Sequence, residues 1–240
     1  MKTIICDNYE ELSLQGAKLI AAQLTQKPDS ILGLATGSTP VGMYQKMIEM
    51  NQKGELDFSA VTSFNLDEYF PITPDNPQSY RYFMEKNLFE HINIRREYTF
   101  VPAGNVENVE EECLRYDAAI DAAGGIDLQV LGIGQNGHIG FNEPDDYLYC
   151  GTHLTPLTES TINANARFFD STDEVPKHAV TMGMKSILKA RTIILLASGK
   201  SKHGAVSALL DDRITTDCPA TLLKLHPNAI LICDKDAYNG

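Results

Sequence analysis

Long hydrophobic runs are missing from this chain of 240 residues. No stretch approaches the roughly 18 consecutive apolar residues that a membrane-spanning helix requires, so we expect no membrane partner. Asp7 follows the first apolar residues too closely for the hydrophobic segment of a secretory signal peptide. These absences predict a protein that remains in the cytoplasm.

Cysteine is scarce, and its pattern excludes two further classes of protein. The five cysteines are an odd number, and no two of them form a Cys-x-x-Cys pair. The six histidines show no zinc-type spacing. We therefore expect reduced thiols, no disulfide framework and no bound metal.

Basic residues are outnumbered, with 20 Lys and Arg against 32 Asp and Glu and a formal net charge of −12. A nucleic-acid-binding domain needs a basic face, so this balance predicts no nucleic-acid partner. A local pocket in an acidic protein can still be basic. An anionic small molecule is therefore compatible with the overall charge.

Common nucleotide and hydrolase motifs are absent as well. No Gly-x-Gly-x-x-Gly follows the first expected strands, the P-loop spacing is missing, and no Gly-x-Ser-x-Gly occurs. Residues 132–137 match the first of these spacings, but they open a histidine-bearing loop where a helix would be required. We therefore expect no dinucleotide and no other cofactor.

Short apolar runs are present, and they alternate with helical patterns along the whole chain. This alternation predicts an α/β fold with a mostly parallel sheet and helices on both faces, hence three layers. No linker or repeat divides residues 1–240, which we interpret as a single domain. The expected strands are residues 2–6, 31–35, 60–66, 126–131, 192–197 and 229–233.

Two loops between a strand and a helix carry small polar residues. In the first, we expect Thr39 to cap a helix that begins with Pro40 and ends near residue 53. The second loop, residues 198–202, adds lysines. Backbone N–H groups at a helix N-terminus attract anions, so both loops are candidate phosphate sites. Ordinary helix caps are the alternative.

Titratable side chains follow two other expected strands. His138 and Glu143 lie in the glycine-rich loop 132–144, where a histidine can transfer protons near neutral pH. Asp67 and Glu68 are adjacent acids, and strand alternation lets at most one of them face a given cleft. The alternatives are a structural glycine turn and two solvated carboxylates. Together the candidates indicate a phospho-metabolite enzyme that uses acid–base chemistry.

Three further stretches are interpreted more simply. A helix is expected over residues 78–91, with its aromatic side chains in the core. The polar segment 145–161 is interpreted as a loop or lid. Arg167 is a lone arginine beside two phenylalanines.

Several separate motifs, in order along almost the whole chain, resemble the glucosamine-6-phosphate deaminase (isomerase–deaminase) family. That resemblance implies a modified Rossmann-type sheet without nucleotide. It also implies conversion of glucosamine 6-phosphate and water to fructose 6-phosphate and ammonia, a hydrolase reaction of amino sugar catabolism. The matching stretches are residues 32–40, 64–69, 137–144, 167–170 and 223–227.

The resemblance implies catalytic roles for four residues. His138, helped by Glu143, would open the sugar ring, and Asp67 would move the C2 proton to C1. Asn136 stands where many family members have aspartate, so it would orient His138 while stabilising a charged ring less strongly.

The resemblance also implies a phosphate site. Gly37, Ser38, Thr39, Arg167 and Lys202 would hold the phosphate of the substrate. Allosteric family members bind an effector with basic side chains in the segment that follows the Glu-Pro pair. This chain has His153 and Thr155 in that segment, so we expect no allosteric effector.

Two alternatives and one assembly state stay open at this point. A 6-phosphogluconolactonase-like hydrolase would share the phosphate loop but would not need an acidic side chain placed to remove the C2 proton. A non-catalytic sugar-phosphate sensor would need an attached DNA-binding module. A homo-oligomer is compatible with the sequence.

Overall fold

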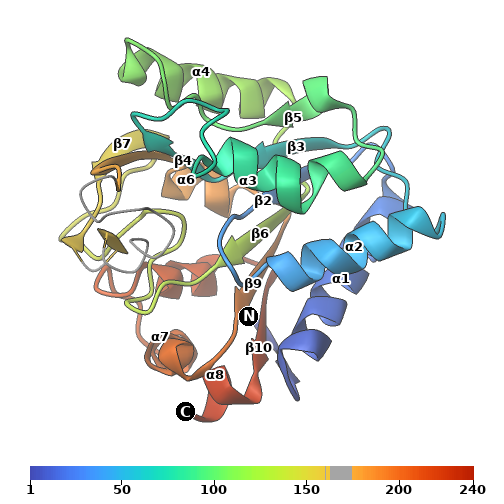
Figure 1. Ribbon diagram of the computed structural model, residues 1–240. Helices are drawn as coiled ribbons and strands as arrows, with labels where there is room; N and C mark the ends of the chain where they lie inside the picture. Colours follow the sequence, from blue (N-terminus) through green and yellow to red (C-terminus); the bar gives the residue numbers. More distant parts are fainter. Residues whose placement is uncertain (160, 163–174) are drawn as a thin grey trace.

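The computed structural model describes residues 1–159, 161–162 and 175–240, and Arg167 lies outside this part of the chain (Figure 1). Within the described residues, a seven-stranded sheet has the order β1-β10-β9-β6-β2-β3-β5, and all its neighbouring strands are parallel. This confirms the predicted α/β fold. The strands are β1 (Lys2–Cys6), β2 (Ile31–Leu34), β3 (Thr62–Asn65), β5 (Thr99–Phe100), β6 (Leu128–Gly132), β9 (Thr192–Ala197) and β10 (Ala229–Asp234).

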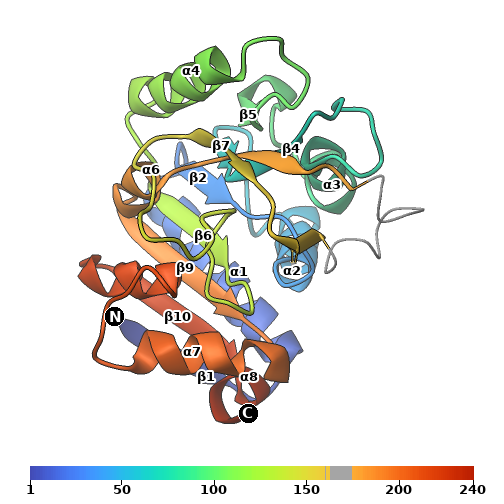
Figure 2. The same cartoon turned by 90° about the vertical axis from the view of Figure 1, so that its left-hand side faces the viewer.

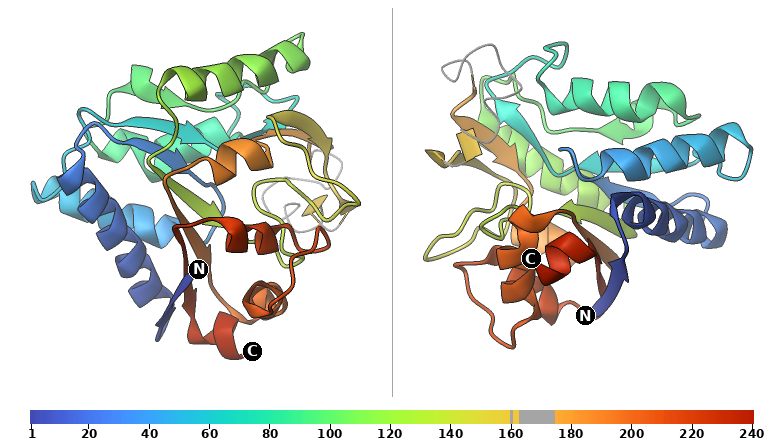
Figure 3. Two further views of the ribbon diagram at one scale, coloured as in Figure 1. Left: turned by 180° about the vertical axis from the view of Figure 1, so that it is seen from behind. Right: turned by 60° about the horizontal axis from the view of Figure 1, so that its bottom comes forward.

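Helices cover both faces of this sheet. Helices α1 (Tyr9–Gln26) and α2 (Val41–Gln52) lie on one face, whereas α6 (Met184–Leu188) and α7 (His203–Leu210) lie on the other (Figures 2 and 3). The three predicted layers are therefore present. Further helices among the described residues are α3 (Tyr80–Asn87), α4 (Val109–Ala122) and α8 (Lys235–Asn239), with 3₁₀ turns at Phe89–His91, Arg96–Tyr98, Lys200–Lys202 and Pro219–Leu225.

Helix α2 begins differently from the sequence-based prediction. Pro40 occupies the N-cap position, and no side chain caps the helix, so the predicted capping role of Thr39 is wrong. The predicted helix end is close to the observed one, because α2 ends at Gln52 and Gly54 follows with a φ of +74°. Thr39 instead lines a cavity that lies beside the uncapped N-terminus.

A second sheet was not predicted. It consists of β4 (Asp67–Phe70), β8 (His178–Thr181) and β7 (His153–Pro156), all antiparallel, in the order β4-β8-β7. Asp67 therefore begins a new strand, and the segment interpreted as a loop contains β7. These four-residue strands pair across long sequence separations. No short turn joins them, so the sequence lacks the signal that predicts a hairpin. The pairing sets Asp67 opposite Thr181.

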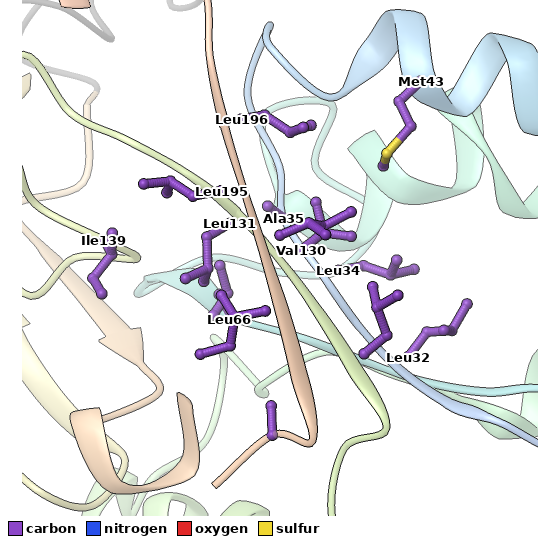
Figure 4. Close-up of a cluster of buried hydrophobic side chains, with 14 of the residues drawn as sticks. Leu32, Leu34, Ala35, Met43, Leu66, Val130, Leu131, Ile139, Leu195 and Leu196 are labelled. Atoms are coloured by element: carbon purple, nitrogen blue, oxygen red, sulfur yellow. The ribbon is translucent and has the colours of Figure 1, made fainter. Parts of the chain in front are cut away.

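The core lies between the central strands and the helices that cover them. Figure 4 shows side chains of β2, β6 and β9 packed together around the middle of the sheet. Leu34, Val130 and Leu196 are each no more than 1% exposed. Burying such a side chain stabilises the fold by roughly 1.5–3 kcal/mol. This packing fixes the carboxyl ends of the strands and hence the loops that leave them.

The described residues also bear on the thiols and on membrane-spanning helices. All five cysteines are free thiols. No helix in the described ranges has the length and apolar character needed to cross a membrane.

Candidate active site

A cavity of about 450 Å³ opens at the carboxyl ends of the central strands. Residues that follow β2 and β6 form most of its lining, and these two strands are neighbours. The chain runs outward to opposite edges of the sheet from this point, which is where open α/β sheets bind ligands. The lining includes Gly37, Ser38, Thr39, Asp67, Tyr80, Gly134, Asn136, His138, Gly140, Phe141, Thr161 and Lys202.

The cavity is lined by groups suited to an anion. Gly37, Ser38 and Thr39 line it directly before α2, and Lys202 reaches it from the 3₁₀ turn that precedes α7. No hydrogen bond within the described part of the chain uses the N–H of Gly37, Ser38 or Thr39. N–H groups before a helix and an ammonium group are donors that a phosphate prefers. The cavity thus brings together four of the five predicted phosphate residues.

Asp67 lies on the wall of the same cavity, at the start of β4. Its side chain is buried, with the residue only 6% exposed. Burial raises the pKa of Asp67 to about 8, and the charge of the neighbouring Glu68 adds to this effect. The carboxyl group can therefore accept or release a proton close to neutral pH.

Glu68 points away from the cavity, as strand alternation predicts. Its carboxylate accepts hydrogen bonds from the backbone N–H groups of Tyr69, Tyr80 and Arg81, at 2.8–2.9 Å. The last two groups belong to the first turn of α3, where a negative charge is favourable. Glu68 therefore holds α3 against β4.

Tyr80 is a cavity residue that the sequence analysis placed in the core. Its ring lies 4.7 Å from that of Tyr69 and 6.1 Å from that of Phe141, measured between centroids. Burial, together with Tyr69 and Asp67, raises the pKa of the Tyr80 phenol well above its ordinary value. Tyr80 thus gives the cavity a neutral aromatic wall near Asp67. No periodic pattern distinguishes it from Phe83 of the same helix, which packs against the main core.

His138 and Glu143 come together as predicted. The Nδ1 atom of His138 lies 3.1 Å from a carboxylate oxygen of Glu143. Gly134 makes room for the ring, because a Cβ atom at this position would lie 2.4 Å from the His138 ring. The carboxylate is therefore close enough to stabilise a proton on the His138 ring at the cavity wall.

Asn136 acts on this pair in a different way from the expectation. Its side-chain amide donates a 2.6 Å hydrogen bond to Glu143, and its oxygen accepts the backbone N–H of His138 at 3.3 Å. The amide thus orients the carboxylate and the loop, and no hydrogen bond joins it to the His138 ring among the described residues. An aspartate in the same conformation would set two carboxylates side by side.

Thr161 is a second residue that the sequence analysis missed. Its hydroxyl donates a hydrogen bond to Glu143 at 2.5 Å and accepts one from the hydroxyl of Thr158 at 3.0 Å. Burial opposes ionisation of Glu143, but the contacts with His138, Thr161 and Asn136 outweigh it and lower the pKa to about 2. Glu143 is therefore ionised near neutral pH, where Asp67 keeps its proton. Two carboxyl groups with pKa values pushed apart are typical of a site with separate acid and base roles.

Asn142 supports the loop and does not line the cavity. Its amide donates to the carbonyl oxygens of Ile139 and Met182, each at 2.9 Å. No group of three or more histidine, cysteine or acidic residues in the described ranges could hold a metal ion.

Comparison with known proteins gives concordant results. The model of the family described as glucosamine-6-phosphate isomerases/6-phosphogluconolactonase matches residues 7–232. The glucosamine-6-phosphate deaminase of Clostridium perfringens is 58% identical over 99% of this chain and 98% of its own length. That of Thermoanaerobacter pseudethanolicus is 56% identical over 99% of this chain and 94% of its own length.

Solved structures agree with these relatives. A monomeric glucosamine-6-phosphate deaminase superposes with a TM-score of 0.97 at 46% identity, over 100% of this chain and 99% of that chain. The 6-phosphogluconolactonase of Thermotoga maritima shares the fold, with a TM-score of 0.76 at 20% identity over 98% and 99% of the two chains. The family model and the close relatives show that this chain belongs to the glucosamine-6-phosphate isomerase/6-phosphogluconolactonase family.

Proposed function

We propose that this protein is a glucosamine-6-phosphate deaminase, which converts glucosamine 6-phosphate and water to fructose 6-phosphate and ammonia. One observation carries the proposal. A single cavity is lined by groups suited to an anion, by the buried carboxyl group of Asp67 and by His138, which pairs with Glu143. Because the net reaction consumes water, we also propose the hydrolase class for it.

In this proposal the phosphate anchors the substrate. The loop 37–39 and Lys202 bind the phosphate, and Arg167 is proposed to join them. An anchored phosphate leaves the sugar to extend along the cavity toward Asp67 and His138. Such positioning lowers the barrier because the reacting groups no longer have to find one another.

Ring opening is the proposed role of His138 and Glu143. His138 moves the proton of the C1 hydroxyl to the ring oxygen while the bond between this oxygen and C1 breaks, so the histidine ends the step in the protonation state in which it began. The ionised Glu143 beside the ring stabilises the charged form of His138. The product of this step is an open-chain aldehyde.

Asp67 is the proposed base for the next step. It takes the proton from C2 to give an enolamine and returns a proton to C1. Water then attacks the resulting iminium at C2, and ammonia leaves the ketose. The ammonium group of the bound substrate lies next to C2, so it would lower the raised pKa of Asp67 and favour the ionised base.

The proposal is tested by assaying glucosamine 6-phosphate and 6-phosphogluconolactone as competing substrates. We expect ammonia and fructose 6-phosphate from the first and little hydrolysis of the second. The buried Asp67 favours this outcome, because lactone hydrolysis does not require a carboxylate that removes a proton from C2. A sugar-phosphate sensor would bind glucosamine 6-phosphate without turnover.

Replacing Lys202 by alanine should raise KM for glucosamine 6-phosphate by roughly 10- to 100-fold, because a charge-assisted hydrogen bond contributes about 1.5–3 kcal/mol. Lys200→Ala is the matched control, since Lys200 lies in the same turn but is exposed and outside the cavity lining. Steady-state kinetics of both variants provide the test. An unchanged KM for Lys202→Ala would rule out the phosphate role.

We expect hyperbolic kinetics without activation by N-acetylglucosamine 6-phosphate. Burial lowers the pKa of His153, the ring of which packs 4.4 Å from that of Tyr149. A neutral histidine and Thr155 offer no positive charge to an anionic effector. Rates measured across substrate concentrations test this prediction, and a sigmoidal curve that the effector straightens would contradict it.

The cytoplasmic location and the assembly state remain part of the proposal. Five free thiols support a reducing compartment. The close structural relative described as monomeric supports a protomer that does not depend on a partner chain for its site.

A further inference from the structure

Tyr9, the first residue of α1, contacts the loop that leads into α2. Its hydroxyl lies 3.1 Å from the carbonyl oxygen of Ser38 and 3.0 Å from that of Thr39. The same hydroxyl oxygen accepts the backbone N–H of Gly42 at 2.8 Å. One phenol therefore joins three backbone groups at the N-terminus of α2.

This contact sets the orientation of the peptide between Ser38 and Thr39. A trans peptide is planar, and its C=O and N–H groups point in opposite directions. With the Ser38 carbonyl held toward Tyr9, the Thr39 N–H faces the opposite side, and both residues line the cavity. If the peptide turned over, a carbonyl oxygen would face the anion and repel it.

The close approach of the two helices is built into their sequences. A Cβ atom at Gly42 would lie 2.9 Å from the Tyr9 hydroxyl and 2.3 Å from the Ser13 hydroxyl. Ser13 in turn donates to the carbonyl oxygen of Tyr9 at 2.8 Å. Glycine at position 42 therefore admits the phenol between α1 and α2.

We propose that Tyr9 is a positioning residue that aims the N–H of Thr39, in the loop 37–39, at a bound phosphate. Tyr9 does not line the cavity and would act only through the backbone of Ser38 and Thr39. The inference extends the proposed function, on which it rests for the identity of the phosphate ester. Binding of inorganic phosphate tests it independently of turnover.

The experiment compares Tyr9→Phe with the wild type. We expect a rise of roughly 3- to 10-fold in KM for glucosamine 6-phosphate, with kcat within about twofold, because the peptide between Ser38 and Thr39 loses the hydrogen bond that orients it. The dissociation constant of inorganic phosphate, measured by calorimetry, should rise by the same factor. Tyr98→Phe is the matched control, because Tyr9 and Tyr98 are 37% and 36% exposed and Tyr98, in the 3₁₀ turn Arg96–Tyr98, is outside the cavity lining.

A second variant keeps the phenol but moves it. Gly42→Ala should also raise both constants, because the added methyl group displaces the hydroxyl. A lower melting temperature with unchanged KM and unchanged phosphate affinity in both variants would show a purely structural contact and overturn the inference. Weaker phosphate binding in a protein that releases no ammonia would support the inference and contradict the proposed function.

Discussion

Replacing Asp67 by asparagine is expected to lower kcat by roughly 10²–10⁴-fold, the usual contribution of a general base, while substrate binding changes little. The variant should also lose exchange of the C2 hydrogen with solvent deuterium, which NMR measures directly. Asparagine has nearly the shape of the buried aspartate but cannot accept the proton. Exchange at the wild-type rate would show that the base lies elsewhere.

The pH dependence of the free energy of unfolding provides a control for Asp67→Asn that does not depend on turnover. The pKa of Asp67 is raised from 3.8 to about 8, so the folded protein keeps a proton that the unfolded chain loses within this range. Stability linked to Asp67 is thus complete below pH 3.8 and declines as the pH rises to about 8. Asparagine does not ionise, so the variant should gain stability relative to the wild type over this window. Denaturant unfolding at several pH values measures the difference.

Glu68→Gln is a poor control for this experiment. Glu68 accepts three backbone N–H groups, two of them at the start of α3. A glutamine there would bring its own N–H donors to a site that needs an acceptor. We therefore expect Glu68→Gln to destabilise the protein, and this loss would be separate from any loss of catalysis.

Replacing Glu143 by glutamine should lower kcat by roughly 10²-fold or more, because the His138 ring loses the carboxylate that stabilises its charged form. Glutamine keeps one acceptor oxygen, so one of the two bonds, from Thr161 or from Asn136, can still orient the side chain. KM should therefore change much less than kcat. Steady-state kinetics with glucosamine 6-phosphate test this expectation.

Glu159→Gln is the matched control for Glu143→Gln, since Glu159 is an exposed acid near the Thr161 contact. It should keep nearly wild-type kcat. The pKa of Glu143 is lowered from 4.5 to about 2, so this carboxylate stabilises the fold above pH 4.5 and loses that contribution as the pH falls toward 2. The stability difference between Glu143→Gln and the wild type should narrow over the same range. Wild-type turnover in Glu143→Gln would contradict the proposed relay.

The parallel sheet could be predicted from the sequence because its strands are short, apolar and separated by helical patterns. The second sheet could not be predicted. Its strand β7 alternates between half-buried and exposed residues, and β4 pairs with a strand more than 100 positions away.

The residues of the site likewise include some that could be predicted from the sequence and some that could not. The cavity is lined by Asp67, His138 and Lys202. These residues follow β3, β6 and β9, which are parallel strands of the central sheet, so they leave the sheet at the same edge. Tyr80 and Thr161 gain their places only through tertiary contacts, which leave no spacing in the sequence. The bond between Asn136 and Glu143 depends on the path of the loop between them, so the residue types alone could not reveal it.

The central claim is that this cavity removes the C2 proton of an amino sugar phosphate on the way to ammonia. The most direct measurement uses glucosamine 6-phosphate that carries deuterium at C2, with the wild-type protein and NMR identification of the products. We expect ammonia and fructose 6-phosphate in equal amounts, with the deuterium removed from C2. An aldose 6-phosphate that retains deuterium at C2, or the absence of ammonia while 6-phosphogluconolactone is hydrolysed, would contradict the account.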